Sequence, residues 1–354
     1  MAAPEHPVHR LLFTVNASQR DTCLLRILLV RLSSMGDVIL TTPLMRALRA
    51  RHPEAELVYL TRPALAPLVA DHPAGVEVLT FDPKGESLGS LAGRLRERRF
   101  THLLDLHGVT RTRLLRLQVP GHWRGYSKRR AARWMLVHGK RDIYRDSVPE
   151  AERFFEAARD LDVRPDGGPA EVGIAAAAAT RGLAWLADRG LGVRRPIAAL
   201  APGAAHFTKR WPQEYWEMLS RLLAAQGYDV AVLTGGDFRE EGAAIAGAGG
   251  VNAASTAGTL GLQETGAILR SARVAVSGDT GLMHLATAVG TRVVALFGPT
   301  VRQFGFFPYR SPATVLELPV GCRPCSAQGG PACPLGHHHC LREILPERVV
   351  EAVR

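Results

Sequence analysis

The sequence contains no hydrophobic run long enough to cross a membrane. Its most apolar stretch, residues 23–32, is interrupted by Arg26 and Arg31, whereas a membrane-spanning helix needs about 20 consecutive apolar residues. The first 20 residues also lack the uninterrupted apolar segment and the small-residue cleavage site of a signal peptide. These absences argue against a spanning helix and a secreted protein, and they predict a cytoplasmic protein with a flexible N-terminal extension at 1–22.

Nothing in the composition points to a disordered or fibrous chain. Hydrophobic residues make up 46% and charged residues 22% of the 354 residues, as in ordinary folded proteins. No internal repeat is visible, and the one biased segment, the alanine run at 175–179, is predicted to be helical. The chain is longer than a single hydrophobic core usually supports, so we expect two domains, at 23–165 and 196–354. They are joined by a connection at 166–195 that is rich in Pro, Gly and Ala.

Acidic residues are almost missing from one segment of the chain. Residues 111–145 hold one acid, Asp142, and eleven basic residues, which account for nearly all of the net charge of +11. Aromatic side chains lie between the basic ones, namely Trp123, Tyr126, Trp134 and Tyr144. This pattern also occurs in nucleic-acid-binding proteins, so a nucleic-acid-binding module is one alternative.

Short apolar segments alternate with amphipathic ones along the whole chain. Strands are predicted at 24–30, 56–60, 76–80, 102–106, 197–200, 229–233, 274–277 and 293–297. Helices are predicted at 64–70, at 88–99 and through Leu40, Leu44 and Leu48, where Pro43 is tolerable only in the first turn. This alternation predicts an α/β fold with two doubly wound parallel sheets, whose functional loops follow the carboxyl ends of the strands. Asp37 and His107 would both lie there.

A loop rich in small residues follows one of the predicted strands of the second half. Small residues allow a ligand to approach the backbone, and the amide groups at the start of the next helix are free to bind an anion. The candidate anion-binding residues of this loop are Asp279, Thr280, Gly281 and His284. The alternative is that Asp279 or Thr280 only caps the helix.

A second loop, at 202–212, brings Thr208, Lys209 and Arg210 to the end of another strand. Adjacent cations and a helix N-terminus can stabilise the charge that develops on a leaving diphosphate without a metal ion. The alternative is a solvated pair of cations. In a third strand-end loop Glu240 could hold ribose hydroxyls, or it could simply favour the start of its helix.

The order and spacing of four motifs resemble those of glycosyltransferase family nine, the lipopolysaccharide heptosyltransferases. The motifs lie at 31–43 (RLSSMGDVILTTP), 209–212 (KRWP), 279–284 (DTGLMH) and 297–300 (FGPT). The resemblance extends over nearly all of the chain from residue 25 to residue 353. It implies a fold of the GT-B type, with two Rossmann-like domains that face a central cleft.

The resemblance also implies a reaction. An ADP-heptose donor would bind the C-terminal domain, and an acceptor of the lipopolysaccharide core, Kdo or heptose on a lipid A precursor, would bind the N-terminal domain. Transfer would invert the anomeric centre and require no cofactor. Asp37 resembles the general base of the family, Lys209 its phosphate-binding lysine and Glu240 its ribose-binding acid, while Ser34 and Gly36 lie in the acceptor loop. A family member with another nucleotide sugar or a protein acceptor is an alternative.

The chemistry of inversion also favours Asp37 as the base. One base must take the proton of the acceptor hydroxyl as this hydroxyl attacks opposite the leaving group, and a carboxylate across the cleft from Lys209 suits that role. The alternative is that Asp37 caps the helix that starts nearby, and both roles can hold together.

Cysteine is scarce, and four of the five cysteines lie close together near the C-terminus. They are Cys322, Cys325, Cys333 and Cys340, with three histidines at 337–339. Their density suggests a structural zinc site, although the spacing is not that of a common zinc finger. Reduced thiols that pack a loop and disulfides are the alternatives. A role in catalysis is not expected.

The basic segment 111–145 falls in the domain to which the resemblance assigns the acceptor. We expect Arg129, Arg130 and Arg133 to bind the acceptor, and the segment to make peripheral contact with the anionic inner face of the cytoplasmic membrane. The rings of Trp123, Tyr126 and Trp134 would rest at the headgroup level. A solvated basic face is the alternative. No nucleic-acid partner is expected under this hypothesis.

Overall fold

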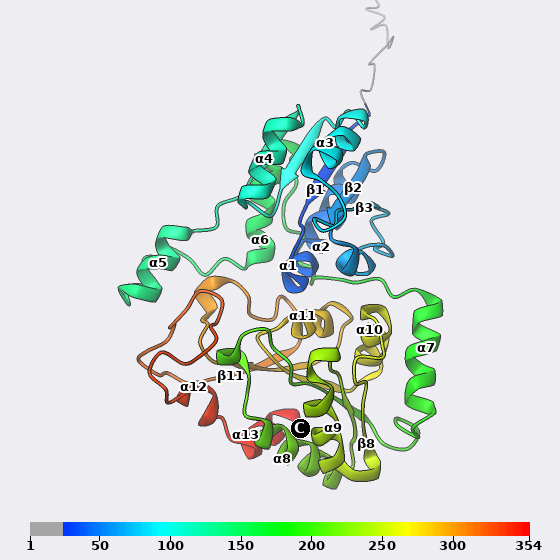
Figure 1. Cartoon of the computed structure of the whole chain (residues 1–354), viewed down its shortest axis with the longest axis vertical. Helices are drawn as coiled ribbons and strands as arrows, with labels where there is room; N and C mark the ends of the chain where they lie inside the picture. The colour runs from blue at the N-terminus through cyan, green and yellow to red at the C-terminus, as the bar shows by residue number, and fades with distance from the viewer. Residues whose placement is uncertain (1–23) are drawn as a thin grey trace, which may run out of the picture.

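The structure, a computed structural model, describes residues 24–354. Figure 1 shows two α/β domains, with the N-terminal part of the chain, blue to cyan, above the C-terminal part. Each domain is built on one parallel sheet. The predicted pair of doubly wound parallel sheets is therefore confirmed. The predicted extension at 1–22 lies outside the described residues, and the domain limits stay a prediction.

The N-terminal sheet has the strand order β3-β2-β1-β4-β5. Its strands are β1 (Arg26–Val30), β2 (Glu56–Thr61), β3 (Glu77–Thr80), β4 (His102–Asp105) and β5 (His122–Gly125). The central strand β1 is apolar and buried from Ile27 to Val30, because helices cover both faces of such a sheet. Sequence reasoning missed β5, since the strand reads His-Trp-Arg-Gly and has no apolar run.

The C-terminal sheet has the order β11-β10-β9-β6-β7-β8. Its strands are β6 (Ile197–Ala201), β7 (Asp229–Val232), β8 (Ala253–Ser255), β9 (Val274–Gly278), β10 (Val293–Phe297) and β11 (Ala313–Glu317). The four predicted strands of this half are present. The two edge strands β8 and β11 were not predicted, because they are only partly buried and lack a continuous apolar sequence.

The helices of the N-terminal half lie around its sheet, except that the helix at 130–138 projects away from the sheet and packs against Phe304 of the C-terminal half (Figure 1). They are α1 (Met35–Leu40), α2 (Thr42–Arg51), α3 (Leu88–Glu97), α4 (Thr110–Gln118), α5 (Arg130–His138) and α6 (Glu150–Arg153), with 3-10 helices η1 (Pro63–Leu68) and η2 (Phe154–Leu161). The single helix predicted through Leu40 and Leu44 is wrong. The chain ends α1 at Leu40 and starts α2 at Thr42, so that Pro43 stands in the first turn of α2, where its missing N–H costs nothing.

The remaining helices cover the C-terminal sheet. They are α7 (Ala176–Ala187), α8 (Gln213–Ala225), α9 (Arg239–Gly249), α10 (Leu262–Ser271), α11 (Gly281–Ala288), α12 (His339–Arg342) and α13 (Pro346–Val353), with 3-10 helices η3 (Phe207–Lys209), η4 (Gly236–Phe238), η5 (Gly250–Asn252) and η6 (Arg302–Phe304). The alanine run is helical, as predicted. It forms the start of α7, which packs along α10. No helix within residues 24–354 is both long and apolar enough to cross a membrane.

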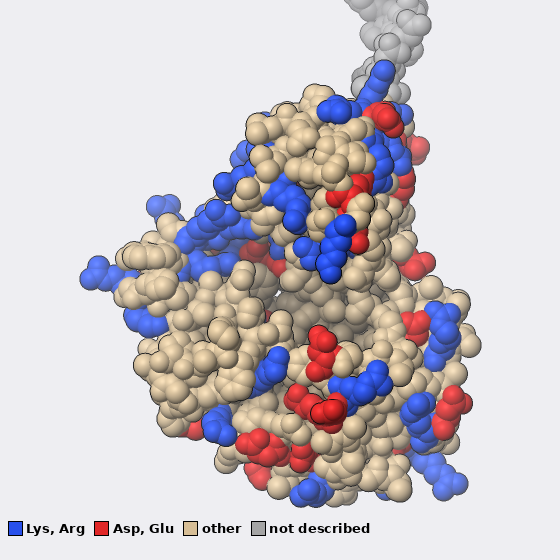
Figure 2. Space-filling view, in the orientation of Figure 1, with Lys and Arg blue, Asp and Glu red and all other residues tan. Residues whose placement is uncertain are grey.

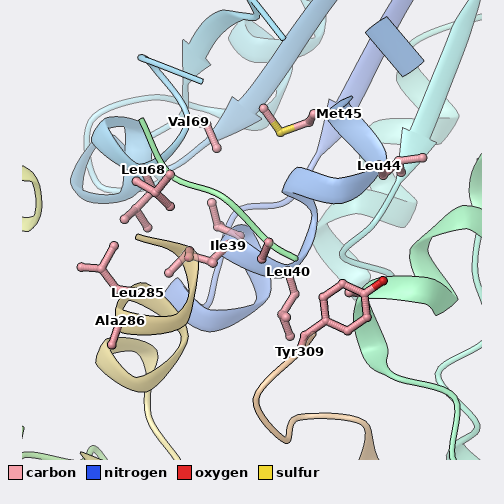
Figure 3. Close-up of a cluster of buried hydrophobic side chains, with 14 of the residues drawn as sticks. Ile39, Leu40, Leu44, Met45, Leu68, Val69, Leu285, Ala286 and Tyr309 are labelled. Atoms are coloured by element: carbon pink, nitrogen blue, oxygen red, sulfur yellow. The ribbon is translucent and has the colours of Figure 1, made fainter. Parts of the chain in front are cut away.

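The two domains meet where α1 contacts α11. Apolar side chains of both domains form one continuous core there. Figure 3 shows Ile39 and Leu68 of the N-terminal domain beside Leu285 and Ala286 of α11. Because the contact is apolar and buried, it fixes the N-termini of the two helices close together.

Glycine at the start of each helix makes this contact possible. A Cβ added to Gly36 would lie 2.6 Å from Cδ2 of His284, and one added to Gly281 would lie 2.5 Å from Sδ and 2.7 Å from Cβ of Met35. Distances this short do not occur between non-bonded atoms, so neither position accepts a larger residue unless the facing side chain or the two helices shift.

We expect Gly281→Ala to separate α1 from α11. The matched control is Gly247→Ala in α9, where an added Cβ meets nothing within 4 Å and where alanine favours the helix by roughly 0.5–1 kcal/mol. Thermal unfolding should show a lower Tm for Gly281→Ala and an unchanged or higher Tm for Gly247→Ala. Equal Tm values for Gly281→Ala and the wild type would show that the domains do not depend on this contact.

Candidate active site

The strand order of each sheet indicates where ligands bind. In the N-terminal sheet the order reverses between β1 and β4, and in the C-terminal sheet it reverses between β6 and β9. A doubly wound sheet binds its ligands beyond the carboxyl ends of the strands at such a reversal. The loops that follow these four strands carry Asp37, His107, Lys209 and Asp279.

One cavity brings the four loops together. Its volume is about 560 Å³, and its walls come from both domains. Figure 2 shows the surface hollowed between the upper and the lower domain. The predicted site residues that line the cavity are Ser34, Gly36, Asp37, Arg133, Lys209, Asp279, Thr280, Gly281 and His284.

Asp37 lies in the first turn of α1 and is held from three directions. A guanidinium nitrogen of Arg31 lies 2.6 Å from its carboxylate. The hydroxyl of Ser34 donates to the same carboxylate at 2.7 Å, and the backbone N–H of Ser34 donates at 3.1 Å. Asp37 therefore caps the start of α1 and faces the cavity as well, so the two expected roles are compatible in this geometry.

The surroundings of Asp37 keep its carboxyl ionised. Burial alone raises the pKa of this carboxyl, but the positive charge of Arg31 and the hydrogen bonds from Ser34 outweigh burial, and the pKa lies below its ordinary value. Asp37 is thus a carboxylate at neutral pH and can accept a proton.

Arg31 is the residue that sequence reasoning left without a role. It is buried, and besides Asp37 it donates to the carbonyl oxygen of Leu106 at 2.5 Å. Burial lowers the pKa of Arg31, but the Asp37 carboxylate outweighs this effect and the pKa is raised. The signal that could have revealed it is its place in the matched motif, at the end of β1 and six residues before Asp37.

Lys209 faces the cavity from the C-terminal domain and is paired with a carboxylate. Its Nζ lies 2.6 Å from Asp279, and the hydroxyl of Thr300 donates to the same carboxylate at 2.7 Å. Asp279 is nearly buried, so the lysine is held in place by a fixed anion. These contacts join the two loops that the sequence predicted to converge on one ligand.

Two histidines in the cavity are uncharged at neutral pH. Burial lowers the pKa of His284 to about 4, and no group in residues 24–354 hydrogen-bonds its Nδ1. Burial, together with the positive charges of Arg31 and Lys128, lowers the pKa of His107 to about 3. Both rings can therefore donate or accept hydrogen bonds, but neither supplies a positive charge near neutral pH.

Five of the predicted site residues do not line the cavity. They are Thr208, Arg210, Glu240, Arg129 and Arg130. Arg210 donates to the carbonyl oxygen of Ala204 at 2.8 Å and lies over the ring of Phe238. Glu240 is exposed in the first turn of α9. Their roles in ligand binding stay predictions.

Thr208 and the cysteine-rich segment pack against each other. Thr208 is buried, and its N–H donates to the carbonyl oxygen of Gly330 at 3.2 Å. The carbonyl oxygen of Thr208 lies 3.0 Å from Nε2 of His338. The segment thus braces the loop that carries Lys209. Thr208 therefore contacts the cysteine-rich segment and supports the loop on the side that faces away from the cavity.

The cysteines of this segment carry free thiols in the structure, and the four are Cys322, Cys325, Cys333 and Cys340. Burial raises the pKa of Cys340 to about 11. Within the described part of the chain, no three His, Cys, Asp or Glu side chains lie close enough to hold a metal ion. The disulfide alternative does not describe this structure, and structural zinc stays a prediction.

The predicted membrane-facing aromatic residues do not all lie at the surface. Trp123 lies on β5, is 5% exposed and belongs to the core of the N-terminal domain, and Tyr126 donates its hydroxyl hydrogen to Glu150 at 2.7 Å. The expectation that these two rings rest among lipid headgroups is therefore wrong. Trp134 is 61% exposed and is compatible with that expectation.

Two parallel α/β domains around a cleft between their strand ends define the GT-B class of glycosyltransferases. A sequence profile of Glycosyltransferase family 9 (heptosyltransferase) matches residues 88–334, and the chain belongs to this family. The resemblance drawn from the motifs is confirmed, and the protein is a glycosyltransferase.

Relatives cover the chain almost from end to end. It is 27% identical to lipopolysaccharide heptosyltransferase 2 of Salmonella typhimurium in an alignment 358 positions long, which covers 92% of this chain and 97% of the relative. The solved structure of the ADP-heptose lps heptosyltransferase II of E. coli matches with a TM-score of 0.72 at 26% identity, over 93% and 97% of the two chains. A family 9 glycosyltransferase from Veillonella parvula matches with a TM-score of 0.76 at 22% identity, over 92% and 95%, and supports the fold.

The pairing of Arg31 with Asp37 predicts a change in pH dependence. In the wild type the pKa of Asp37 is low, so kcat/KM should fall only at a pH below the ordinary pKa of an aspartate. Arg31→Gln removes the charge, so the pKa of Asp37 should rise and, as the pH is lowered, activity should be lost at a higher pH than in the wild type. Arg31→Lys keeps the charge and should leave the acid limb near its wild-type position. Superimposable pH profiles of the Gln variant and the wild type would contradict the pairing.

Proposed function

We propose that the protein transfers a heptose from ADP-heptose to the inner core of lipopolysaccharide, Kdo or heptose, with inversion at the anomeric carbon and without a metal ion. The observation that carries the proposal is one cavity with the Asp37 carboxylate on the N-terminal side and Lys209 on the C-terminal side. The names of the relatives point to the same donor and acceptor, since they include an ADP-heptose lps heptosyltransferase II and lipopolysaccharide heptosyltransferase 2.

Asp37 would act as the base. Its carboxylate is ionised, faces the cavity and is oriented by Arg31 and Ser34, and an ionised carboxylate in this position can take the proton of an acceptor hydroxyl as that hydroxyl attacks the sugar. A low pKa makes Asp37 a weak base in the ground state. Proton transfer late in the reaction, when the attacking hydroxyl has become more acidic, suits such a base.

Lys209 and the start of α11 would stabilise the leaving diphosphate. Lys209 is held by Asp279, and the loop that opens α11 contributes Thr280 and Gly281 to the cavity wall. A cation next to unpaired amide groups at a helix N-terminus favours developing negative charge. This arrangement supplies the electrostatic role that a metal ion has in other glycosyltransferases. The donor-binding roles expected of Thr208, Arg210 and Glu240 would have to be exerted from outside the cavity wall, because none of the three lines the cavity.

The reaction itself can be tested directly. The purified protein is incubated with ADP-heptose and with truncated core acceptors that end in Kdo or in heptose, with and without EDTA, and the lipid products are analysed by mass spectrometry. Addition of one heptose in both conditions supports the proposal, and NMR of the product gives the anomeric configuration. Transfer that stops at once with EDTA and returns with magnesium would overturn the metal-independent mechanism.

Asp37→Asn should lower kcat by about 10²- to 10⁴-fold, because an amide cannot accept the proton. The affinity for ADP should stay within about twofold of the wild type, since Asp37 faces the acceptor in this proposal. Calorimetry with ADP and steady-state kinetics measure the two quantities. Asp82→Asn, at an exposed carboxylate outside the cavity, is the matched control. An Asp37→Asn enzyme with more than half of the wild-type kcat would refute the base.

We also propose that α4 lies against an anionic membrane surface at the cytoplasmic face. Leu114 and Leu117 are 47% and 82% exposed, although both are apolar, and the exposed Arg113 and Arg116 alternate with them. Figure 2 shows Lys and Arg side chains gathered on the side of the upper domain where α4 and α5 lie. Exposed leucines among cations favour the boundary between headgroups and acyl chains of an anionic lipid layer.

The double variant Leu114→Ser and Leu117→Ser should lose most of its binding to phosphatidylglycerol vesicles in a sedimentation assay and keep its activity on a water-soluble core acceptor. Val251→Ser is the matched control, because Val251 is 94% exposed on the other domain. Vesicle binding that is equal in the double variant and in the control would exclude α4 as the contact.

A further inference from the structure

Four long cationic side chains line the cavity, and they fall into two kinds. Arg31 and Lys209 are each paired with a carboxylate at 2.6 Å. Lys128 and Arg133 line the same cavity, and neither has an ion pair with any residue of 24–354. Lys128 precedes α5 and Arg133 lies on it, both in the N-terminal domain. An unpaired cation in a partly dry cavity attracts an anion from outside the chain.

Lys128 is a desolvated cation. Its side chain lies against Gly108, where an added Cβ would be 3.2 Å from Cε of the lysine. Burial lowers the pKa of Lys128, and the positive charges of Arg31 and Arg130 lower it further, while Asp37 and Glu150 act in the opposite direction. Asp37 and Glu150 therefore only partly offset the effects of burial and of the neighbouring positive charges on Lys128.

Arg133 is held at the boundary between the domains. Its guanidinium lies over the ring of Phe304, with 5.3 Å between Cζ and the ring centroid, and Leu136 and Val137 of the same helix pack on Phe304. Within the described chain its Nε is buried without a hydrogen-bond partner. A buried guanidinium donor without an acceptor is rare in folded proteins, and no residue of 24–354 offers an acceptor to this Nε.

Two further acids of this region, Glu150 and Glu156, are already paired with other cations. Glu150 lines the cavity, but it is paired with Arg153 at 3.0 Å and accepts a hydrogen bond from Tyr126. Glu156 is paired with Arg129 and accepts the N–H of Ser127 at 2.8 Å. The chain therefore neutralises Arg129 and Arg153 internally and leaves the charges of Lys128 and Arg133 for a ligand.

We infer that Lys128 and Arg133 form a subsite for an anionic group of the acceptor, a carboxylate or a phosphate next to the hydroxyl that attacks. This inference rests on the proposed function and deepens it, since it names the acceptor chemistry that the site selects. The subsite lies on the side of Asp37, because the charges of Asp37 and Arg31 both act on Lys128. The leaving diphosphate has Lys209 and the start of α11 on the opposite wall.

The test combines variants with altered acceptors. Lys128→Gln and Arg133→Gln are assayed with a water-soluble core acceptor, with the same acceptor after reduction of its carboxyl groups to alcohols, and with the dephosphorylated acceptor. Loss of one charged hydrogen bond should raise the acceptor KM about 10- to 100-fold with little change in the Kd of ADP. The wild type should show a similar rise for the acceptor that lacks the recognised anion, whereas the variants should not distinguish that acceptor from the intact one.

Arg145→Gln is the matched control, because Arg145 is exposed in the same basic segment and does not line the cavity. Its acceptor KM should equal that of the wild type. The carboxyl-reduced and dephosphorylated arms identify which anion is bound. An unchanged KM in the two variants, an equal loss with all three acceptors, or a Kd of ADP that weakens as much as KM rises would each overturn the subsite while heptose transfer continued. A wild-type protein that transfers no heptose to the intact acceptor would instead refute the proposed function and the subsite with it.

Discussion

The contact between the N-termini of α1 and α11 is the constraint on which the site depends. Each helix follows a strand at the reversal of its own sheet, so each carries a candidate functional loop. Gly36 against His284 and Gly281 against Met35 bring the two loops as close as backbone and side chain allow. The apolar core beneath them continues from one domain into the other. A carboxylate from one domain and a lysine from the other thereby share one cavity.

The charged residues of this cavity differ in whether they are paired within the chain. Arg31 keeps Asp37 ionised and Asp279 keeps Lys209 in place, so both groups are charged and oriented before any ligand arrives. Preorganised charges of this kind act without the cost of reorienting water during the reaction. Lys128 and Arg133 differ because no acid of the described chain forms an ion pair with either of them. On its N-terminal side the cavity thus presents the Asp37 carboxylate together with two cations that lack an ion pair within the described chain.

Several features were predictable because they depend on residues adjacent in the chain. The strands of both sheet centres are continuous apolar runs. The motifs of Asp37 and Asp279 directly follow strands, and Lys209 lies in the loop after β6. Strands without such a run were not predicted. The strand β5 contains His122 and Arg124, and the edge strands β8 and β11 are only partly buried. The helix around Pro43 was predicted as one and is two, since proline fixed where a helix could begin.

The sequence by itself determined the fold class, the family and the loops that surround the cavity, because buried periodicity and motif order are properties of neighbouring residues. Only the tertiary structure decided which cations of the basic segment face the cavity. Glu156 pairs with Arg129 and Asp160 pairs with Arg124, across 27 and 36 residues, and both pairs depend on how η2 packs beside β5. Trp123, which the sequence analysis expected at the surface, is buried in the core that α3 and α4 form on the sheet. A charge count along the chain cannot separate paired from unpaired cations, because pairing depends on distances that only folding creates.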